Sequence, residues 1–291
     1  MKQPNSKKKL LTRRRLLFCG AGLGVAAVTG GWARYFESEW IELTRRDVAL
    51  RGKKLAAPIR VLHMSDIHAS RFVSQSYIND VFSLGLAEKP DLICVTGDFI
   101  TKRHHERESY VRALRRLSDA APTFGCIGNH DGGWWIAEHA DGFSEPAEVM
   151  ALLEESGIEC LYNRSCTIEL SGRPIHVAGV ADLYSRETLP SLAFEKIPRK
   201  TDDPVLLLAH NPDTKRLVRP YKWDLMLSGH THGGQIAFPF LGAPIVAIHD
   251  RRYARGLNRW LDRWIHTSRG VGNVRGVRFN CRPEITLLTL S

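Results

Sequence analysis

The chain has 291 residues, of which 43% are hydrophobic and 25% are charged, a composition that excludes a disordered protein. Its formal net charge is +10, but residues 1–15 hold seven Lys and Arg and no acidic residue, so the remainder carries only about +3. An extended basic face is therefore not expected, and specific nucleic-acid binding is excluded from the candidate functions.

Residues 1–36 are typical of an export signal or a membrane anchor. The segment "TRRRLL" (12–17) resembles a twin-arginine signal, and an uncharged stretch rich in Gly and Ala follows at 16–33. A short membrane anchor is the alternative, and the aromatic residues of "WARYFESEW" (32–40) suit a membrane interface. Because the basic cluster stays inside, both interpretations place the remainder in the periplasm or on the outer face of the inner membrane. The export machinery and the membrane are then the expected partners.

Residues 37–54 are expected to connect this segment to one large domain at 55–291. Short apolar runs that end in small or polar residues predict buried strands at 57–65, 91–97, 122–128, 174–181, 204–210 and 223–229. Helical periodicity predicts helices at 76–89, 108–120 and 145–157. The alternation of strand and helix predicts an α/β fold, and the extended segments of the C-terminal third, of which 278–290 is the clearest, predict a second, more antiparallel sheet.

Polar side chains follow five of the predicted strands. The strand ends are "SDIH" (65–68), "GDF" (97–99), "GNHD" (128–131), "AHN" (209–211) and "GHTHGG" (229–234). Loops at the carboxyl ends of parallel strands converge on one edge of a sheet, so these Asp, Asn and His side chains are expected to meet. Each residue taken singly would be an ordinary turn or cap residue, but five such endings in order indicate a metal site.

Spacing and donor chemistry narrow the kind of metal. In an extended segment residues i and i+2 project to the same side, which would bring Asp66 and His68 to one point, and His230 and His232 likewise. Carboxylate and imidazole donors suit Mn²⁺, Fe²⁺ or Zn²⁺ better than Ca²⁺. The absence of cysteine ligands disfavours a structural zinc site.

These five blocks, in this order, resemble the calcineurin-like metallophosphoesterases over roughly residues 60–235. With the twin-arginine-like start, "TSRGVG" (267–272) and "NCRPEITLL" (280–288), the whole chain is similar to the exported bacterial phosphodiesterases of the YaeI-like branch. The resemblance implies a four-layer sandwich of two mixed β-sheets flanked by helices, with the metals at one edge of the sandwich.

The resemblance also implies two divalent metal ions and their ligands. One ion would be bound by Asp66, His68, Asp98 and His232, and the other by Asp98, Asn129, His210 and His230. Asp98 would then bridge the two ions. His130 matches the family's non-ligand histidine over the scissile phosphate, and Asp131 either orients its imidazole or caps the next segment.

The predicted function is a metal-dependent phosphoesterase, most simply a phosphodiesterase, in which a hydroxide bridging the two metals attacks phosphorus. The alternatives are a membrane-associated pyrophosphatase that cleaves a nucleotide-linked lipid such as UDP-2,3-diacylglucosamine, and a non-catalytic metal-binding protein. The expected substrate is thus a phosphodiester or a lipid-linked phosphate. Trp134 either contacts that substrate or packs, and Arg269 either binds a phosphate oxygen or forms a structural salt bridge.

Overall fold

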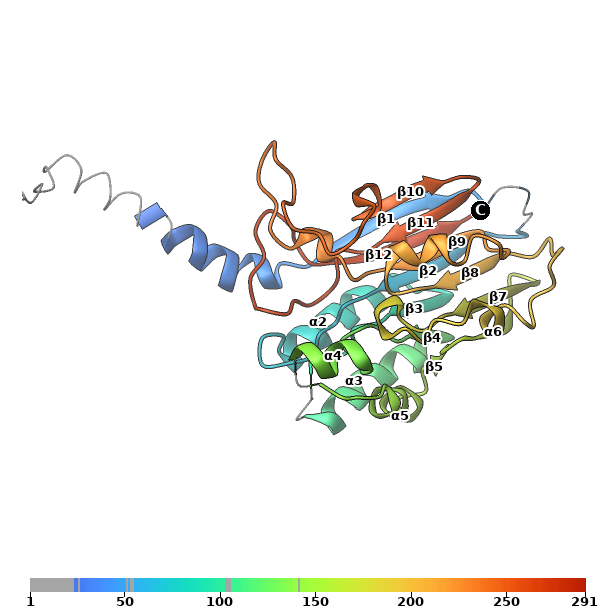
Figure 1. The fold of residues 1–291 in the computed structure, drawn as a ribbon, viewed down its shortest axis with the longest axis horizontal. Coiled ribbons are helices and arrows are strands. Elements are labelled where there is room, and N and C mark those ends of the chain that lie inside the picture. Colours follow the sequence, from blue (N-terminus) through green and yellow to red (C-terminus); the bar gives the residue numbers. More distant parts are fainter. Residues whose placement is uncertain (1–23, 26, 51, 53–54, 103–105, 141) are drawn as a thin grey trace, which may run out of the picture.

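The computed structural model describes residues 24–25, 27–50, 52, 55–102, 106–140 and 142–291 (Figure 1). The twin-arginine-like segment at 12–17 lies outside these ranges. Residues 27–35 are helical and lead into a 3-10 turn, η1 (Glu37–Glu39). Within the described ranges, none of the helices combines the length and the hydropathy that a membrane span requires.

The first sheet has six strands in the order β1-β12-β2-β3-β4-β5. Their bounds are β1 Glu42–Val48, β12 Glu284–Leu290, β2 Ile59–Met64, β3 Leu92–Thr96, β4 Thr123–Cys126 and β5 Glu159–Cys160. All neighbours are parallel except β12 and β2. The segment 37–54, expected to be a connection, therefore contributes β1, which lies beside β12 at the edge of this sheet.

The second sheet has six strands in the order β10-β11-β9-β8-β7-β6. Their bounds are β10 Gly256–Trp260, β11 Arg263–Thr267, β9 Leu225–Ser228, β8 Val205–Leu208, β7 Arg173–Gly179 and β6 Arg164–Leu170. The four central strands run parallel, and an antiparallel strand closes each edge. The prediction of two mixed sheets is confirmed, because both sheets contain parallel and antiparallel pairs.

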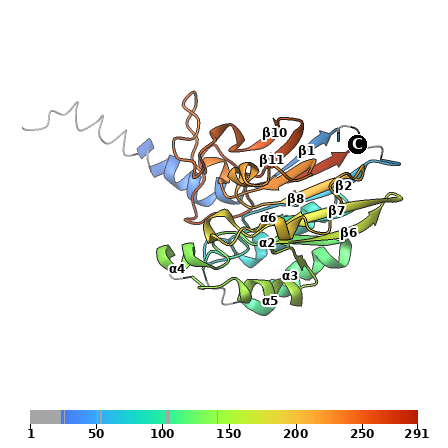
Figure 2. The same ribbon diagram turned by 45° about the vertical axis from the view of Figure 1, so that its right-hand side comes forward.

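Helices cover the outer face of the first sheet (Figures 1 and 2). They are α2 (Gln75–Leu86), α3 (Arg107–Ala120) and α5 (Ala147–Glu155), close to the three predicted ranges. Ser74 caps α2 by accepting a hydrogen bond from the amide of Tyr77, which satisfies one free N–H of the first turn. Among the described residues, the outer face of the second sheet carries the short α6 (Pro190–Ala193) and 3-10 turns.

The strands alternate their side chains between two apolar layers. In β2, Val61 packs between the sheets with Leu206 and Leu225, whereas Leu62 packs against the helices with Ile78 and Leu114. This double burial explains why the strand segments read as unbroken apolar runs in the sequence. It also fixes the two sheets against each other, so the loops at their carboxyl ends are held on a rigid support.

One polar pair lies inside the layer between the sheets. His63 of β2 and His266 of β11 face each other with their Nδ1 atoms 2.8 Å apart, and Nε2 of His63 lies 2.9 Å from the hydroxyl of Thr96. One Nδ1 must donate and the other accept, so the accepting ring must be neutral in this arrangement. Burial lowers the pKa of both histidines, that of His266 to about 4.

Acid should therefore destabilise the fold through this pair. An exposed histidine in the unfolded chain takes up a proton below about pH 6.5, whereas folded His266 does so only near pH 4, so the free energy of unfolding falls as the pH falls through this window. We expect a loss of about 2 kcal/mol between pH 7 and pH 5 from this one group. Urea unfolding of the chelator-treated chain at both pH values measures it. In the variant His266→Gln the pH dependence should shrink by that amount, and an unchanged slope would contradict the assignment.

Candidate metal centre

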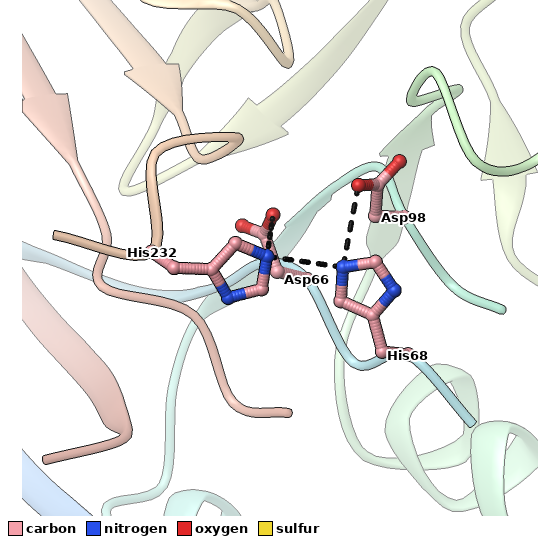
Figure 3. A group of neighbouring side chains, drawn as sticks. All are labelled: Asp66, His68, Asp98 and His232. Carbon is pink, nitrogen blue, oxygen red and sulfur yellow. Dashed lines mark hydrogen bonds and ion pairs between the residues drawn. The ribbon is translucent and has the colours of Figure 1, made fainter. Parts of the chain in front are cut away.

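The predicted site residues meet at the edge where the strands of both sheets end. Asp66 and His68 follow β2, Asp98 follows β3, and His232 belongs to the loop after β9. Each offers a ligand atom within 4.8 Å of the others, and all four residues are buried (Figure 3). The convergence predicted from the strand ends is therefore observed in the structure.

The first set of donors surrounds Nε2 of His68. This atom lies 3.3 Å from Oδ2 of Asp98 and 3.1 Å from Nε2 of His232. Nε2 of His232 in turn lies 3.3 Å from Oδ1 of Asp66. Figure 3 shows the two imidazoles and the two carboxylates turned toward one another.

The second set lies on the other side of Asp98. Nε2 of His210 is 3.3 Å from the same Oδ2 of Asp98 and 4.0 Å from Oδ1 of Asp66. Nδ1 of His230 is 2.7 Å from Oδ1 of Asn129, and the rings of His210 and His230 are 5.2 Å apart. One carboxylate oxygen of Asp98 thus faces an imidazole nitrogen from each set.

Hydrogen bonds on the outer side of the rings fix which nitrogens are free to bind a cation. His210 donates from Nδ1 to the carbonyl of Thr96 (2.6 Å), and His230 donates from Nε2 to the carbonyl of Ala247 (3.2 Å). The hydroxyl of Thr101 donates to the carbonyl of His68 and accepts from its Nδ1 (3.2 Å). In each neutral ring the inner nitrogen then carries a lone pair and faces acceptor atoms.

The pKa values of the site residues indicate that a positive charge would be stabilised at the centre of the site. Burial raises the pKa of Asp66, while for Asp98 burial is outweighed by His210 and His130, which hold its pKa well below the ordinary range. Burial lowers the pKa of His230 to about 3 and that of His232 well below its ordinary value. Buried Nε2 of His210 has no hydrogen-bond partner among the described residues. His210 differs from His230 and His232, because the carboxylates of Asp98 and Asp66 raise its pKa well above the ordinary value. A cation at this centre would take the place of that proton, and buried carboxylate and imidazole donors of this kind bind divalent cations, so the residues fit metals.

The local backbone that aims these side chains differs from the expected extended geometry. Asp66, His68, Asp98, His230 and His232 all have φ between 50° and 66°, in the left-handed region. The i, i+2 argument from extended segments was therefore wrong. Tight turns still bring donor atoms of Asp66 and His68 within 4.8 Å of each other, whereas His230 and His232 contact different donors, Asn129 and Asp66. Each such residue costs roughly 1 to 3 kcal/mol, and strain of this kind concentrates at functional sites.

Glycines are required where the backbone passes close to the carboxylates. A Cβ on Gly229 would lie 1.8 Å from Oγ of Ser65 and 2.1 Å from Oδ2 of Asp66, and one on Gly128 would lie 2.2 Å from Oδ1 of Asp98. These positions precede His230 and Asn129 respectively. The "GN" and "GH" pairs of the sequence therefore combine a ligand with the close approach that only glycine allows.

Comparison with known proteins gives the same assignment as the geometry. Residues 59–234 match the family described as Calcineurin-like phosphoesterase. The chain belongs to the calcineurin-like phosphoesterase family. Since the match includes all five strand-end blocks, and the donor set is present, the chain is a metal-dependent phosphoester hydrolase. The family and the Asp/His cluster together support a dinuclear site for divalent metals.

Individual relatives span nearly the whole chain. It is 39% identical over 97% of its length to Phosphodiesterase YaeI of Escherichia coli (strain K12), all of which is covered. It is 31% identical to the uncharacterized metallophosphoesterase YkuE of Bacillus subtilis (strain 168), with 97% of this chain and 98% of that one covered. It is 24% identical to UDP-2,3-diacylglucosamine pyrophosphatase LpxG of Chlamydia muridarum (strain MoPn / Nigg), with 94% and 98% covered.

In this calcineurin-like phosphoesterase, His130 stands beside the metal donors without joining them. Its backbone amide donates to Oδ1 of Asp98 (2.8 Å), and its Nδ1 donates to the carbonyl of Thr101 (2.9 Å). Asp131, one of whose predicted roles was to orient His130, instead accepts hydrogen bonds from the amides of Gly128, Asp98 and Ile100. Asp131 therefore ties together the loops after β3 and β4, and the carbonyl of Thr101 orients the imidazole.

The two residues predicted as possible substrate contacts have different surroundings. Arg269 is engaged by two carboxylates, with Nε 2.6 Å from Glu284 and a terminal nitrogen 2.8 Å from Glu42, so the structure favours the structural salt bridge over phosphate binding. Trp134 begins α4 (Trp134–Ala140), is 43% exposed and stacks under the guanidinium of Arg186 at 3.9 Å. It stays a predicted contact. Its neighbour Trp135 packs against the ring of His130 at 5.0 Å.

The sequence did not indicate a role for Arg278, whose guanidinium binds the backbone of the loop beside the metal donors. This arginine is fully buried, and its guanidinium donates to the carbonyls of Arg269, Gly270, Gly272 and Cys281. A terminal nitrogen also lies 3.4 Å from Nδ1 of His232. No spacing rule marks such a residue, because its partners are backbone carbonyls brought near only by the fold.

Removing this arginine should destabilise the protein strongly. Arg278→Met leaves the carbonyls of Arg269, Gly272 and Cys281 without this donor, while Gly270 keeps the amide of Glu284, and we expect the free energy of unfolding to fall by about 3 kcal/mol. Exposed Arg275 is the matched control, for which Arg275→Met should change stability by no more than about 0.5 kcal/mol. Urea unfolding of both variants makes the comparison, and equal stabilities would show that the guanidinium does not hold this loop.

Proposed function

We propose that this chain is a phosphodiesterase that binds two divalent cations at the carboxyl edge of its sheets. Asp66, His68, Asp98 and His232 would hold one cation, and Asp98, Asn129, His210 and His230 the other. The observation that carries this proposal is the position of Asp98, whose single Oδ2 faces an imidazole nitrogen on each side at 3.3 Å.

The mixture of carboxylate, amide and imidazole donors suits Mn²⁺, Zn²⁺ or Fe²⁺. Two such cations, when bound, supply an activated water and neutralise charge on the phosphoryl oxygens. The chain's own residues set the geometry around them. His130 holds Asp98 through its amide, and its imidazole donates from Nδ1 to the carbonyl of Thr101. In the imidazolium form, Nε2 carries a second proton, which the ring would give to the leaving oxygen.

Similarity to Phosphodiesterase YaeI over 97% of the chain supports a diester substrate. A second candidate, cleavage of a nucleotide-linked lipid pyrophosphate such as UDP-2,3-diacylglucosamine, is favoured by the similarity to pyrophosphatase LpxG. The N-terminal sequence supports export to the periplasm or outer face of the inner membrane, with attachment through residues 1–36. A cytoplasmic nucleotide-linked lipid conflicts with that orientation. Protease treatment of spheroplasts tests it, since full protection of the domain would refute export.

The substrate assay separates the two activities. We expect the purified full chain, supplied separately with Mn²⁺, Zn²⁺ and Mg²⁺, to hydrolyse bis(p-nitrophenyl) phosphate at least about tenfold faster than p-nitrophenyl phosphate, because only the diester places an ester group on both sides of phosphorus. UDP-2,3-diacylglucosamine in detergent is the third substrate. Turnover of this pyrophosphate alone would replace the diesterase proposal with the second candidate, and no turnover with any metal would contradict both.

A further inference from the structure

The loop that follows His232 exposes apolar side chains beside the metal centre. No Asp, Glu, Lys or Arg occurs between Thr231 and His249. Five large apolar side chains in residues 236–245, which we call the apolar loop, are exposed: Ile236, Phe238, Phe240, Leu241 and Ile245. A contiguous exposed patch of this kind marks a surface that contacts something other than water.

Two backbone hydrogen bonds within the apolar loop close a turn at its tip. The amide of Phe238 donates to the carbonyl of Gly242 (2.8 Å), and the amide of Gly242 donates back to Phe238 (2.9 Å). Phe240, at the tip between them, has a φ of 66° and is fully exposed. A bulky residue rarely adopts this conformation, and the turn leaves both Phe240 and Leu241 exposed to solvent.

A second apolar element lies at the same end of the molecule (Figures 1 and 2). The aromatic turn, residues 32–40, exposes Trp32, Tyr35, Phe36 and Trp40, the ring types that favour a membrane interface. The segment 278–281 joins the two elements. The amide of Arg278 donates to the carbonyl of Ala33, and Phe279 exchanges hydrogen bonds with Gln235 and Ala237 at the base of the apolar loop.

Basic side chains flank both elements. Arg251 donates to the carbonyl of Pro244 in the apolar loop (2.7 Å), and Arg34 lies over the rings of Tyr35 and Phe72. Beside the apolar loop, Asp250 is already paired with Lys215 and Arg252. The aromatic turn contains two acidic residues, of which Glu37 is buried and accepts from the amide of Cys281, whereas Glu39 is exposed. Apolar and aromatic residues with arginines beside them match an anionic lipid surface, where the rings enter the interface and the cations meet headgroups.

We propose that the apolar loop and the aromatic turn form one membrane-docking face, in which the loop enters the outer part of an anionic bilayer. Because His232 lies four residues before Ile236, this face would bring the metal centre to the lipid headgroups. The substrate class would then be an amphiphilic phosphoester whose apolar part stays in the bilayer. That substrate class rests on the proposed function, whereas docking of the loop does not.

A fluorescent probe on the loop tests docking independently of the N-terminal segment. Leu241→Cys in the full chain, labelled with the environment-sensitive dye NBD, is mixed with vesicles of phosphatidylcholine containing about one quarter phosphatidylglycerol. The matched control is Leu261→Cys, because Leu261 is also exposed (64%, against 83% for Leu241) but precedes β11 and so lies at the opposite end of the second sheet. The unsubstituted chain, labelled in the same way, gives the background from native cysteines.

We expect vesicles to shift the emission of the dye at 241 to the blue and increase it by at least about twofold, with no change at 261. Equal responses at 241 and 261 would overturn the proposal. So would a blue shift at 241 that grows with protein concentration in the absence of vesicles, since a second copy or another part of the chain would then cover the loop.

Hydrolysis of bis(p-nitrophenyl) phosphate by the labelled Leu241→Cys chain is measured in parallel. If neither the labelled variant nor the unsubstituted chain hydrolysed this diester, the result would count against the proposed function and not against docking.

Discussion

Replacing Asp98 with Asn should reduce diester hydrolysis by about a thousandfold or more and remove bound metal. The Oδ2 atom of Asp98 faces both His68 and His210. The side-chain amide of Asn at this position would therefore remove a negative charge that both halves of the site share. Asn keeps the shape of the side chain, which separates loss of charge from loss of packing. Steady-state kinetics and metal analysis of the same preparation measure the two effects together.

The control for this variant is Asp119→Asn at the exposed end of α3, which should keep full activity and metal content. Single-ligand variants sharpen the test. His232→Ala and His230→Ala should each lose about one cation, and each should empty a different half, because His232 contacts Asp66 whereas His230 contacts Asn129. If Asp98→Asn kept two cations per chain, Asp98 would not be the shared ligand.

Replacing His130 with Gln should reduce the turnover number for a diester by about a hundredfold or more while metal content stays unchanged. The imidazole makes no ion pair with the donor set, and its Nδ1 is occupied by the carbonyl of Thr101, so the ring has only Nε2 to offer the reaction. Gln can keep a donor toward Thr101 but cannot deliver a proton. The loss should be larger for an alkyl leaving group than for p-nitrophenolate, which leaves without a proton.

His139 supplies the matched control, since it is an exposed histidine on α4 that bonds the carbonyl of Trp135. His139→Gln should be indistinguishable from the unsubstituted chain. Equal losses of His130→Gln on alkyl and nitrophenyl diesters would limit the ring to charge stabilisation, and no loss on either would remove it from the mechanism.

The sequence predicted the structure correctly where the residue types of a segment are compatible with few structural roles. Buried strands appeared as apolar runs, and the Asp, Asn and His that follow them predicted a convergent site, because parallel strands must end at one edge. The strand β1 escaped prediction, since "ELTRRDV" has three consecutive exposed charged residues, Arg45 to Asp47, which break the alternation typical of a strand. The helix α4, only seven residues long, was missed for a similar reason, because it buries a single residue, Ile136.

Interactions that depend on the fold stayed beyond the sequence. Asp131 and His130 are neighbours in the chain, yet the carboxylate of Asp131 binds amides from two loops and leaves the imidazole to Thr101. The sequence left two roles open for Arg269, because it does not show that Glu42 and Glu284, which are far apart in the chain, both pair with the guanidinium. Left-handed φ values at five site residues have no residue signature, because Asp and His tolerate several backbone states.

The position of β12 affects when the metal centre can form. Residues 284–290 fill the place between β1 and β2, so the first sheet stays divided until the last strand has been made. The amide of Glu284 also donates to the carbonyl of Gly270, whose Cα lies against Asp66. During synthesis from the N-terminus, a growing chain would hold most of the ligands without their final support. Metal is therefore expected to bind only after β12 has taken its place in the first sheet.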